Sequence, residues 1–318
     1  MVKVLVNFEL PGHLRQRLLD EAGSKAQFVF ADDDAAALRA IVDAEVVFGI
    51  VSPEIFAAAR KLRWYQSSVA SQERYMFPAL IDSDVQLTNM AGIYNEEIAD
   101  HVYALILGLT RLIPRFTRNQ DRRYWEPHGQ FKAEYLMGKT IGIIGLGGIG
   151  GEVAKRAPTF GMRVVATRAH PGRPKPEYVD QVWGPEGLDE LLRISDIVVN
   201  CTPETPRTRK LIGRRELALM KRTARLINIG RGAVVDLTAL TEALQSGAIA
   251  GAGLDVYEIE PLPADHPLWG LQTAILTPHM ASVTDIYPAR RVEVFLDNLG
   301  RYLRGETLHN LVDKEDWH

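Results

Sequence analysis

The chain has 318 residues, about twice the length of an average domain, so we expect two domains. Its formal net charge is −3 and charges of both signs are interleaved, which excludes a strongly basic surface and leaves no nucleic acid among the expected partners. The single cysteine, Cys201, excludes an intrachain disulfide, and no apolar run has the length of a membrane span. Because the opening segment is unlike a secretory signal, we expect a cytoplasmic protein without a membrane partner.

The first part of the chain alternates between short β-branched runs and amphipathic helical patterns. Strands are predicted over residues 2–8, 27–30, 46–49 and 62–66, and helices over residues 14–22, 35–42 and 55–60. This alternation predicts a parallel sheet with helices on both faces.

The pattern changes after this first series. Residues 96–118 predict one long helix, and a polar stretch with aromatic residues follows over 119–131. A second strand–helix series runs over 140–278, and a final helical pattern begins at residue 282. We expect the final helix to return to the first sheet. This gives a discontinuous first domain of residues 1–94 plus 286–318, a continuous second domain of residues 95–285, and a cleft between them.

The second series opens with a glycine pattern, Thr-Ile-Gly-Ile-Ile-Gly-Leu-Gly-Gly-Ile-Gly over residues 140–150. A predicted strand precedes it, and a helix (152–160) and another strand (163–166) follow, as a dinucleotide-binding unit requires. Gly145 would permit the tight turn, Gly147 the approach of a pyrophosphate, and Gly150 close packing of helix on strand. The alternative is a glycine-rich turn with no ligand.

The residue that ends the second strand of this unit bears on the choice of nicotinamide cofactor. An NAD site usually has Asp or Glu there, but this chain has Thr167-Arg168 and no acid between Gly161 and Pro176. A guanidinium pairs with a 2′-phosphate, which a carboxylate would repel. We therefore predict a preference for NADP(H), with NAD(H) as the alternative cofactor and a solvated loop arginine as the alternative role of Arg168.

Three ionisable residues follow predicted strands of the second series: Arg231, Glu260 and His279. Ligands bind at the carboxyl ends of strands in open α/β sheets, so these residues could share one edge. Reduction of a 2-oxo acid needs a proton donor, for which His is suited, a carboxylate that orients it, and a cation for the substrate carboxylate. Each residue alone could instead cap a turn or lie on the surface.

Several segments then resemble the D-2-hydroxyacid dehydrogenase family. They are Gly145-Leu-Gly-Gly-Ile-Gly, Pro203-Glu-Thr-Pro-Arg-Thr, Ile227-Asn-Ile-Gly-Arg-Gly, Leu254-Asp-Val-Tyr-Glu-Ile-Glu-Pro-Leu-Pro, Thr277-Pro-His and Ile98-Ala-Asp-His-Val. The segment Trp64-Tyr-Gln-Ser resembles the subgroup that acts on glyoxylate and hydroxypyruvate. The resemblance implies a flavodoxin-like substrate domain, a Rossmann-like cofactor domain, and a homodimer formed through the cofactor domains.

The resemblance also implies site residues. The catalytic residues would be Arg231, Glu260 and His279, and the substrate would contact Ser68, Val69, Ala70, Arg231 and His279. The cofactor would contact Gly145, Gly147, Gly148, Ile149, Gly150, Thr167, Arg168, Cys201, Thr202, Pro203, Thr208, Ile229, Gly230, Asp255 and Ala281. Asp255 would lie near the nicotinamide amide, and residues 201–203 would line the adenosine side.

The sequence departs from the family pattern in the substrate loop, where Ser71 and Glu73 replace the common Gly and Asp. No Cys/His cluster has metal-ligand spacing, so no metal is expected. Two other functions stay open. One is a dinucleotide-sensing, corepressor-like protein without turnover, and the other is an enzyme of the same fold that acts on formate or phosphite.

Overall fold

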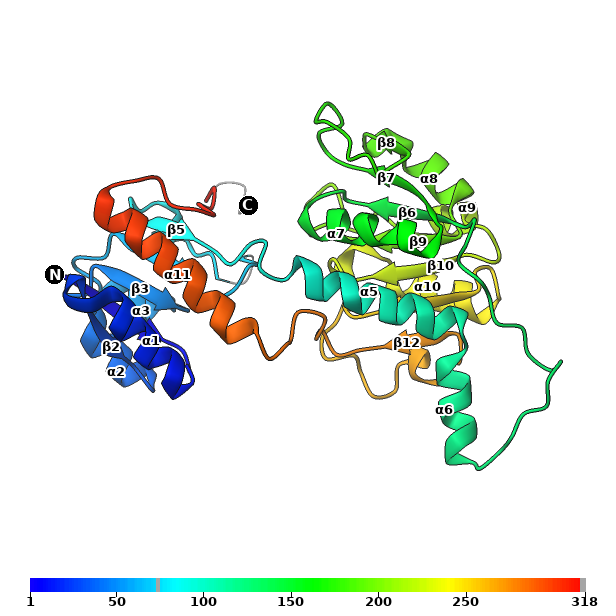
Figure 1. The fold of residues 1–318 in the computed structure, drawn as a ribbon, viewed down its shortest axis with the longest axis horizontal. Coiled ribbons are helices and arrows are strands. Elements are labelled where there is room, and N and C mark those ends of the chain that lie inside the picture. The colour runs from blue at the N-terminus through cyan, green and yellow to red at the C-terminus, as the bar shows by residue number, and fades with distance from the viewer. Residues whose placement is uncertain (73–74, 315–318) are drawn as a thin grey trace. The chain divides into compact units, whose positions relative to one another are not determined.

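The computed structural model describes residues 1–72 and 75–314, which fold into two compact units (Figure 1). Unit 1 contains residues 1–93 and the segment from residue 284 onward, whereas unit 2 is the continuous stretch 94–283. Each unit has its own parallel sheet with helices on both faces, which confirms the predicted α/β fold class with two doubly wound sheets.

Unit 1 has a five-stranded parallel sheet in the order β2-β1-β3-β4-β5. Its strands are β1 (Val2–Asn7), β2 (Ala26–Phe30), β3 (Val46–Gly49), β4 (Trp64–Ser67) and β5 (Gln86–Thr88). Its helices are α1 (Gly12–Ala22), α2 (Asp34–Ile41), α3 (Pro53–Ala58), α4 (Pro78–Ile81) and α11 (Tyr287–Arg304).

Both faces of the unit 1 sheet are covered, as expected for a parallel sheet. Successive side chains of a strand point to opposite faces, so Tyr65 of β4 joins the core formed with α2, α3 and α4. Its neighbour Trp64 lies on the other face and stacks on Phe295 of α11. The last helix of the chain therefore completes the core of unit 1.

Unit 2 has a seven-stranded parallel sheet in the order β12-β11-β10-β9-β6-β7-β8. Its strands are β6 (Thr140–Ile144), β7 (Arg163–Thr167), β8 (Gln181–Trp183), β9 (Ile197–Asn200), β10 (Arg225–Asn228), β11 (Gly251–Leu254) and β12 (Ala274–Leu276). Its helices are α5 (Asn95–Thr110), α6 (Ile113–Asp121), α7 (Gly148–Arg156), α8 (Leu188–Ile194), α9 (Arg214–Leu219) and α10 (Leu237–Gln245).

The strand order of unit 2 identifies the edge where a ligand is expected. The chain passes from β6 outward to β7 and β8, then returns to β9 on the other side of β6. Helices α5 and α7 cover one face, and α8, α9 and α10 cover the other. In such sheets the crevice for ligands lies at the carboxyl ends of the strands, where the strand order reverses. That position here is the carboxyl end of β6 and β9.

The long helix predicted over 96–118 is wrong, because the structure has two helices there. α5 ends at Thr110 and α6 begins at Ile113, and Leu112 between them has a left-handed backbone with a φ of 61°. Pro114 explains the break, since a proline in a helix interior removes a hydrogen bond and its ring clashes with the carbonyl four residues earlier.

The final helix also begins later than predicted, at Tyr287 instead of residue 282. Pro288 lies in its first turn, where a proline costs no hydrogen bond. The short elements α4 and β5 were not predicted, since three or four residues show no clear hydrophobic period.

Candidate active site

The glycine pattern forms the turn between β6 and α7. Gly145 has a φ of 94°, which favours glycine, and its N–H donates to the carbonyl of Thr167 at 3.0 Å. A Cβ on Gly150 would lie 2.2 Å from the Gly145 carbonyl oxygen, so this glycine permits the close approach of helix and strand. A Cβ on Gly147 would meet nothing within 4 Å, which leaves open space at the start of α7 for an anionic group.

Two other residues predicted to contact the cofactor lie in the first turn of α7. A Cβ on Gly148 would be 2.5 Å from the amide nitrogen of Asn95, so α5 approaches closely here. Ile149 is partly buried against the core that α5 forms with the sheet. The start of α7 is thus fixed by packing, with its N-terminal residues Gly147 and Gly148 exposed.

Arg168 follows the buried Thr167 at the carboxyl end of β7. Its guanidinium closes a proline-rich loop, with Nη2 donating to the Pro171 carbonyl at 3.1 Å and Nη1 to the Pro174 carbonyl at 3.3 Å. Its Nε is buried and has no hydrogen-bond partner among the residues that the structure describes. This N–H group could therefore donate a hydrogen bond to an anionic group.

The segment after β9 contains Cys201, Thr202 and Pro203. Burial raises the pKa of the Cys201 thiol to about 12, although part of the side chain is exposed, so it stays protonated at neutral pH. The Thr202 hydroxyl donates to Oδ1 of Asn200 at 2.7 Å. The Thr208 hydroxyl donates to the Pro203 carbonyl at 2.6 Å and closes this loop. The segment is therefore an ordered edge beside the glycine turn, without a reactive thiolate.

Arg231 lies three residues after the end of β10, in the turn that follows the buried Ile229 and Gly230. A Cβ on Gly230 would be 2.4 Å from the Thr202 carbonyl oxygen, and a Cβ on Gly232 would be 1.9 Å from the Tyr257 carbonyl group. The flanking glycines are needed for these close approaches and not for a positive φ. They pack the Arg231 turn between the segments that follow β9 and β11.

Glu260 and His279 form a hydrogen-bonded pair after β11 and β12. Their Oε2 and Nδ1 atoms are 2.8 Å apart, and the other Glu260 oxygen accepts the N–H of Tyr257 at 3.0 Å. The His279 side chain is 48% exposed and that of Glu260 is 20% exposed. The pair fixes the ring through Nδ1, so Nε2 is the nitrogen that can exchange a proton with a bound molecule.

Asp255 lies directly after β11 and is 1% exposed. Its carboxylate accepts the N–H groups of Met280 and Ala281, both at 2.9 Å, and the hydroxyl of Thr277 at 2.6 Å. His101 of α5 contacts the same hydroxyl through Nε2 at 3.0 Å. His101 was not among the predicted site residues, because its position in the chain, far from Thr277, gives no sign of this contact.

The predicted substrate loop of unit 1 follows β4. Ser68 is buried and its carbonyl accepts the hydroxyl of Tyr287 at 3.2 Å, while Val69 and Ala70 are partly exposed. Ser71 follows them, and Glu73 lies outside the described residues. The loop is thus held at its start and accessible at Val69 and Ala70.

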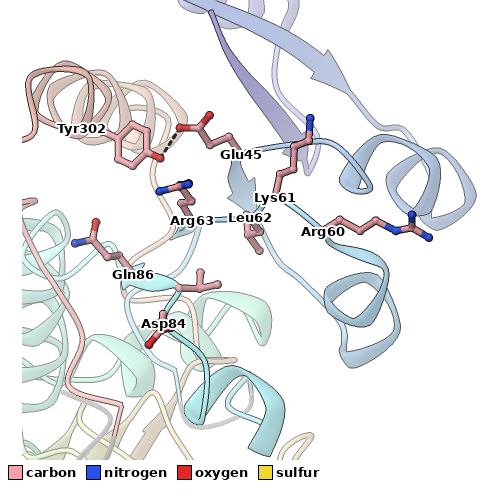
Figure 2. Close-up of a pocket in the computed structure, with 9 residues that line it drawn as sticks. Glu45, Arg60, Lys61, Leu62, Arg63, Asp84, Gln86 and Tyr302 are labelled. Carbon is pink, nitrogen blue, oxygen red and sulfur yellow. Dashed lines mark hydrogen bonds between the residues drawn. The ribbon is translucent and has the colours of Figure 1, made fainter.

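A hollow of about 780 Å³ lies at the opposite, amino-terminal edge of the unit 1 sheet, before β3, β4 and β5 (Figure 2). It is lined by Glu45, Arg60, Lys61, Leu62, Arg63, Asp84, Val85, Gln86 and Tyr302. Tyr302 donates its hydroxyl to Glu45 at 2.7 Å, and Figure 2 shows Arg60 pointing away from the other labelled side chains. Ligands of parallel sheets bind at the other edge, so this hollow is not the candidate site.

The described residues also show whether a metal-binding cluster or a membrane-spanning helix is present among them. Among residues 1–72 and 75–314, no cluster of three or more His, Cys, Asp or Glu side chains could hold a metal ion. In the same ranges, no helix has the length and apolar character needed to cross a bilayer.

Comparison with known proteins gives consistent matches. Residues 103–281 match the family model for the NAD-binding domain of D-isomer-specific 2-hydroxyacid dehydrogenases. A glyoxylate reductase of Korarchaeum cryptofilum is 37% identical over 270 residues, which covers 83% of this chain and 80% of that protein.

Comparison with solved structures gives matches to the same family. A D-isomer-specific 2-hydroxyacid dehydrogenase family protein from Aeromonas salmonicida has a TM-score of 0.87 at 30% identity, covering 98% of this chain and 99% of the other. A D-isomer-specific 2-hydroxyacid dehydrogenase from Xanthobacter autotrophicus, solved with NADPH and MES, has a TM-score of 0.83 at 28% identity over 100% of both chains.

Proposed function

Because this chain belongs to the D-isomer-specific 2-hydroxyacid dehydrogenase family, we propose that it reduces a small 2-oxo acid such as glyoxylate or hydroxypyruvate to the D-2-hydroxy acid. The observation that carries the proposal is the His279–Glu260 pair, whose Nδ1 and Oε2 atoms are 2.8 Å apart. Glu260 follows β11, which neighbours the strand β10 that leads to Arg231, and His279 follows β12, which neighbours β11.

In this mechanism the imidazole of His279 donates a proton to the oxygen of the substrate carbonyl. Glu260 accepts a hydrogen bond from Nδ1–H, which orients the ring and leaves Nε2–H to donate. Arg231 would bind the substrate carboxylate through its planar donors. Its Nη1 donates to the Gly230 carbonyl at 2.8 Å, which restricts the orientation of the guanidinium. Val69 and Ala70 of unit 1 would add backbone N–H donors for the same carboxylate.

The residues of unit 2 fit a nicotinamide dinucleotide, which supplies the hydride when bound. The open space beside Gly147 suits the pyrophosphate, and Gly150 permits α7 to start close to β6. Asp255 and Ala281 would hold the nicotinamide end, and residues 201–203 with Thr208 the adenosine end. Unit 2 is thus the proposed dinucleotide-binding domain, and unit 1 the proposed substrate domain.

The proposed cofactor is NADP(H), with Arg168 as the partner of the 2′-phosphate. Two observations support this: the buried, unpartnered Nε of Arg168 among the described residues, and the absence of an acid from residues 161–176. The similar Xanthobacter autotrophicus dehydrogenase was solved with NADPH.

Arg168→Ala tests the cofactor proposal. We expect KM for NADPH to rise about tenfold or more while KM for NADH changes little, because only NADPH offers the phosphate that the guanidinium pairs with. Steady-state kinetics with both cofactors measures this. A clear preference of the wild type for NADH would contradict the assignment.

The reaction itself is tested by following NADPH oxidation with glyoxylate, hydroxypyruvate, pyruvate, phenylpyruvate and branched 2-oxo acids. We expect turnover with at least one of them, and His279→Ala should lower kcat by about 10²-fold or more, the usual scale of acid–base catalysis. His279 is half-exposed, so the melting temperature should not change. Cofactor binding without turnover across the panel would favour the dinucleotide-sensing alternative.

The proposed assembly is a cytoplasmic homodimer formed through unit 2. Large apolar side chains are exposed on α6 and the segment that follows it. They are Ile113, Tyr124, Trp125, Tyr135 and Met137. Such a set is typical of an interface between copies of one chain. Light scattering of the purified protein measures the oligomeric state, and a monomer would contradict this assignment.

A further inference from the structure

We propose that His101 and Thr277 are positioning residues that fix the turn carrying His279, and that they act through the carboxylate of Asp255. The inference rests on the proposed function, because it concerns the orientation of the proposed acid. His101 belongs to α5, the first helix of unit 2, and lies 176 positions before Thr277 in the chain.

The direction of the hydrogen bonds in this group follows from the number of available protons. Thr277 has one hydroxyl proton, and the contact of its Oγ1 with Asp255 Oδ1 is short, at 2.6 Å. The carboxylate is an acceptor only, so Thr277 donates to it. The same Oγ1 lies 3.0 Å from His101 Nε2 and must there act as acceptor. His101 therefore has its proton on Nε2 and donates to Thr277.

The carboxylate that receives this hydrogen bond orders the turn around His279. Asp255 Oδ1 accepts the N–H of Met280 and Oδ2 accepts that of Ala281, so the two residues after His279 are tied to one buried side chain. The His279 N–H donates to the backbone carbonyls of Asp255 at 2.8 Å and Thr277 at 3.1 Å.

The backbone of His279 needs such support. Its φ is 52°, a left-handed conformation that a residue with a side chain rarely adopts without help from its surroundings. The strained residue is the proposed acid, and its ring must reach both Glu260 and the substrate. Loss of the contacts at Asp255 would let the turn relax and would lengthen the His279–Glu260 hydrogen bond.

Other ionisable groups around this turn are already paired. The single hydroxyl proton of Tyr257 is shared between the carbonyls of Leu254 at 3.0 Å and Thr277 at 2.9 Å. Burial and then the charge of Asp255 raise the pKa of Tyr257, so it remains a neutral donor. Glu260 faces His279, and His101 Nε2 lies 3.7 Å from Asp255 Oδ1. His101 and Thr277 are thus polar side chains that can be removed to loosen the turn while both members of the His279–Glu260 pair are kept.

The test compares two disruptive variants with two conservative ones. Thr277→Val and His101→Leu remove one hydrogen bond each, whereas Thr277→Ser keeps the hydroxyl and His101→Gln keeps a nitrogen donor near the position of Nε2. We expect the disruptive variants to lower kcat for 2-oxo acid reduction about tenfold, since a small misplacement of a catalytic group is costly, and to change KM less than about threefold. The conservative variants should stay within about threefold of the wild type.

The split between kcat and KM separates positioning from a general loss of stability. The melting temperatures of all four variants are measured beside the kinetics. Thr277→Val and His101→Leu should be folded at the assay temperature and still have a lower kcat, whereas Thr277→Ser and His101→Gln should restore it. A loss of kcat explained by unfolding at the assay temperature, or wild-type kcat in Thr277→Val, would overturn the inference.

A second readout does not depend on turnover. The ring resonances of His279, assigned by comparison with His279→Gln, should shift in Thr277→Val and His101→Leu and not in Thr277→Ser. Long-range ¹H–¹⁵N spectra should show the proton of His101 on Nε2 in the wild type. Unchanged His279 resonances would overturn the positioning role even if the reductase activity is found. An inactive wild type with shifted resonances would instead refute the proposed function and support this inference.

Discussion

At the scale of single residues, glycines bring the proposed site together by removing side-chain atoms where segments approach closely. Gly230 lies against the segment that follows β9, and Gly232 lies against the carbonyl group of Tyr257 after β11. Arg231 between them is thus placed by its neighbours on both sides. The glycines can be found in the sequence. Why glycine is needed at these positions depends on the neighbouring segments, which only the structure shows.

Gly232→Ala tests this explanation. Its Cβ would lie 1.9 Å from the Tyr257 carbonyl group, so the Arg231 turn or the segment before Glu260 must shift. We expect a lower melting temperature and a loss of reductase kcat/KM of about 10²-fold, the scale that a displacement of about 1 Å produces.

Gly172→Ala is the matched control, because a Cβ there would meet nothing within 4 Å and its φ is not in the positive range. Its activity and melting temperature should equal those of the wild type. Equal behaviour of the two alanine variants in thermal melts and kinetics would show that close approach does not matter at Gly232.

At the scale of secondary-structure elements, an ion pair ties the segment that leads into β6 to the amino end of β10. Arg225 is buried, and its Nη2 donates to Glu134 Oε1 at 2.6 Å. Lys139 lies 2.8 Å from the other Glu134 oxygen. Burial alone would raise the pKa of Glu134, but the hydrogen bonds from Arg225 and Lys139 outweigh it and hold the pKa below its ordinary value.

Glu134→Gln should therefore destabilise the protein in a pH-dependent way. A carboxyl whose pKa is lowered by folding stabilises the folded state above its unfolded pKa, and this contribution is lost as pH falls through the lower folded pKa. We expect a loss of about 2 kcal/mol at pH 7, the scale of a hydrogen bond to a charged group. The difference in melting temperature from the wild type should shrink below about pH 4.5, the ordinary Glu value.

The control is Glu306→Gln, which removes an exposed partner of Arg304. Exposed ion pairs contribute little to stability, so melting scans of this variant should match the wild type across the pH range. A Glu134→Gln difference that stays constant from pH 7 to pH 4 would mean that packing, and not charge, explains the loss.

The strands and helices show how much of the fold and of the site could be predicted from the sequence alone. The strands before the glycine turn and before Arg231 were predicted, because a short apolar run next to a glycine is a local signal. The break at Leu112 was missed because the hydrophobic period continues across it. The role of His101 could not be predicted, since its contact with Thr277 depends on how α5 packs on the sheet.

At the scale of the whole molecule, the two units differ in how they are assembled from the chain. Unit 2 is one continuous stretch with a core on each face of its sheet. Unit 1 needs both ends of the chain, because Phe295 of α11 is fully buried and stacks on Phe48, with ring centres 4.4 Å apart. The same ring lies 5.4 Å from Trp64. Residues 1–93 therefore lack part of their own core.

This difference predicts how fragments of the chain behave. Residues 94–283 expressed alone should fold and bind NADPH, measured by nucleotide fluorescence and a thermal melt, but should not reduce any 2-oxo acid, since the proposed substrate loop is missing. Residues 1–93 alone should not fold, and Phe295→Ala in the full chain should destabilise unit 1 by about 3–5 kcal/mol, the usual range for a buried Phe. A cooperative thermal transition in residues 1–93 would show that the sheet of unit 1 does not need α11, and the argument for a core shared by both ends of the chain would fail.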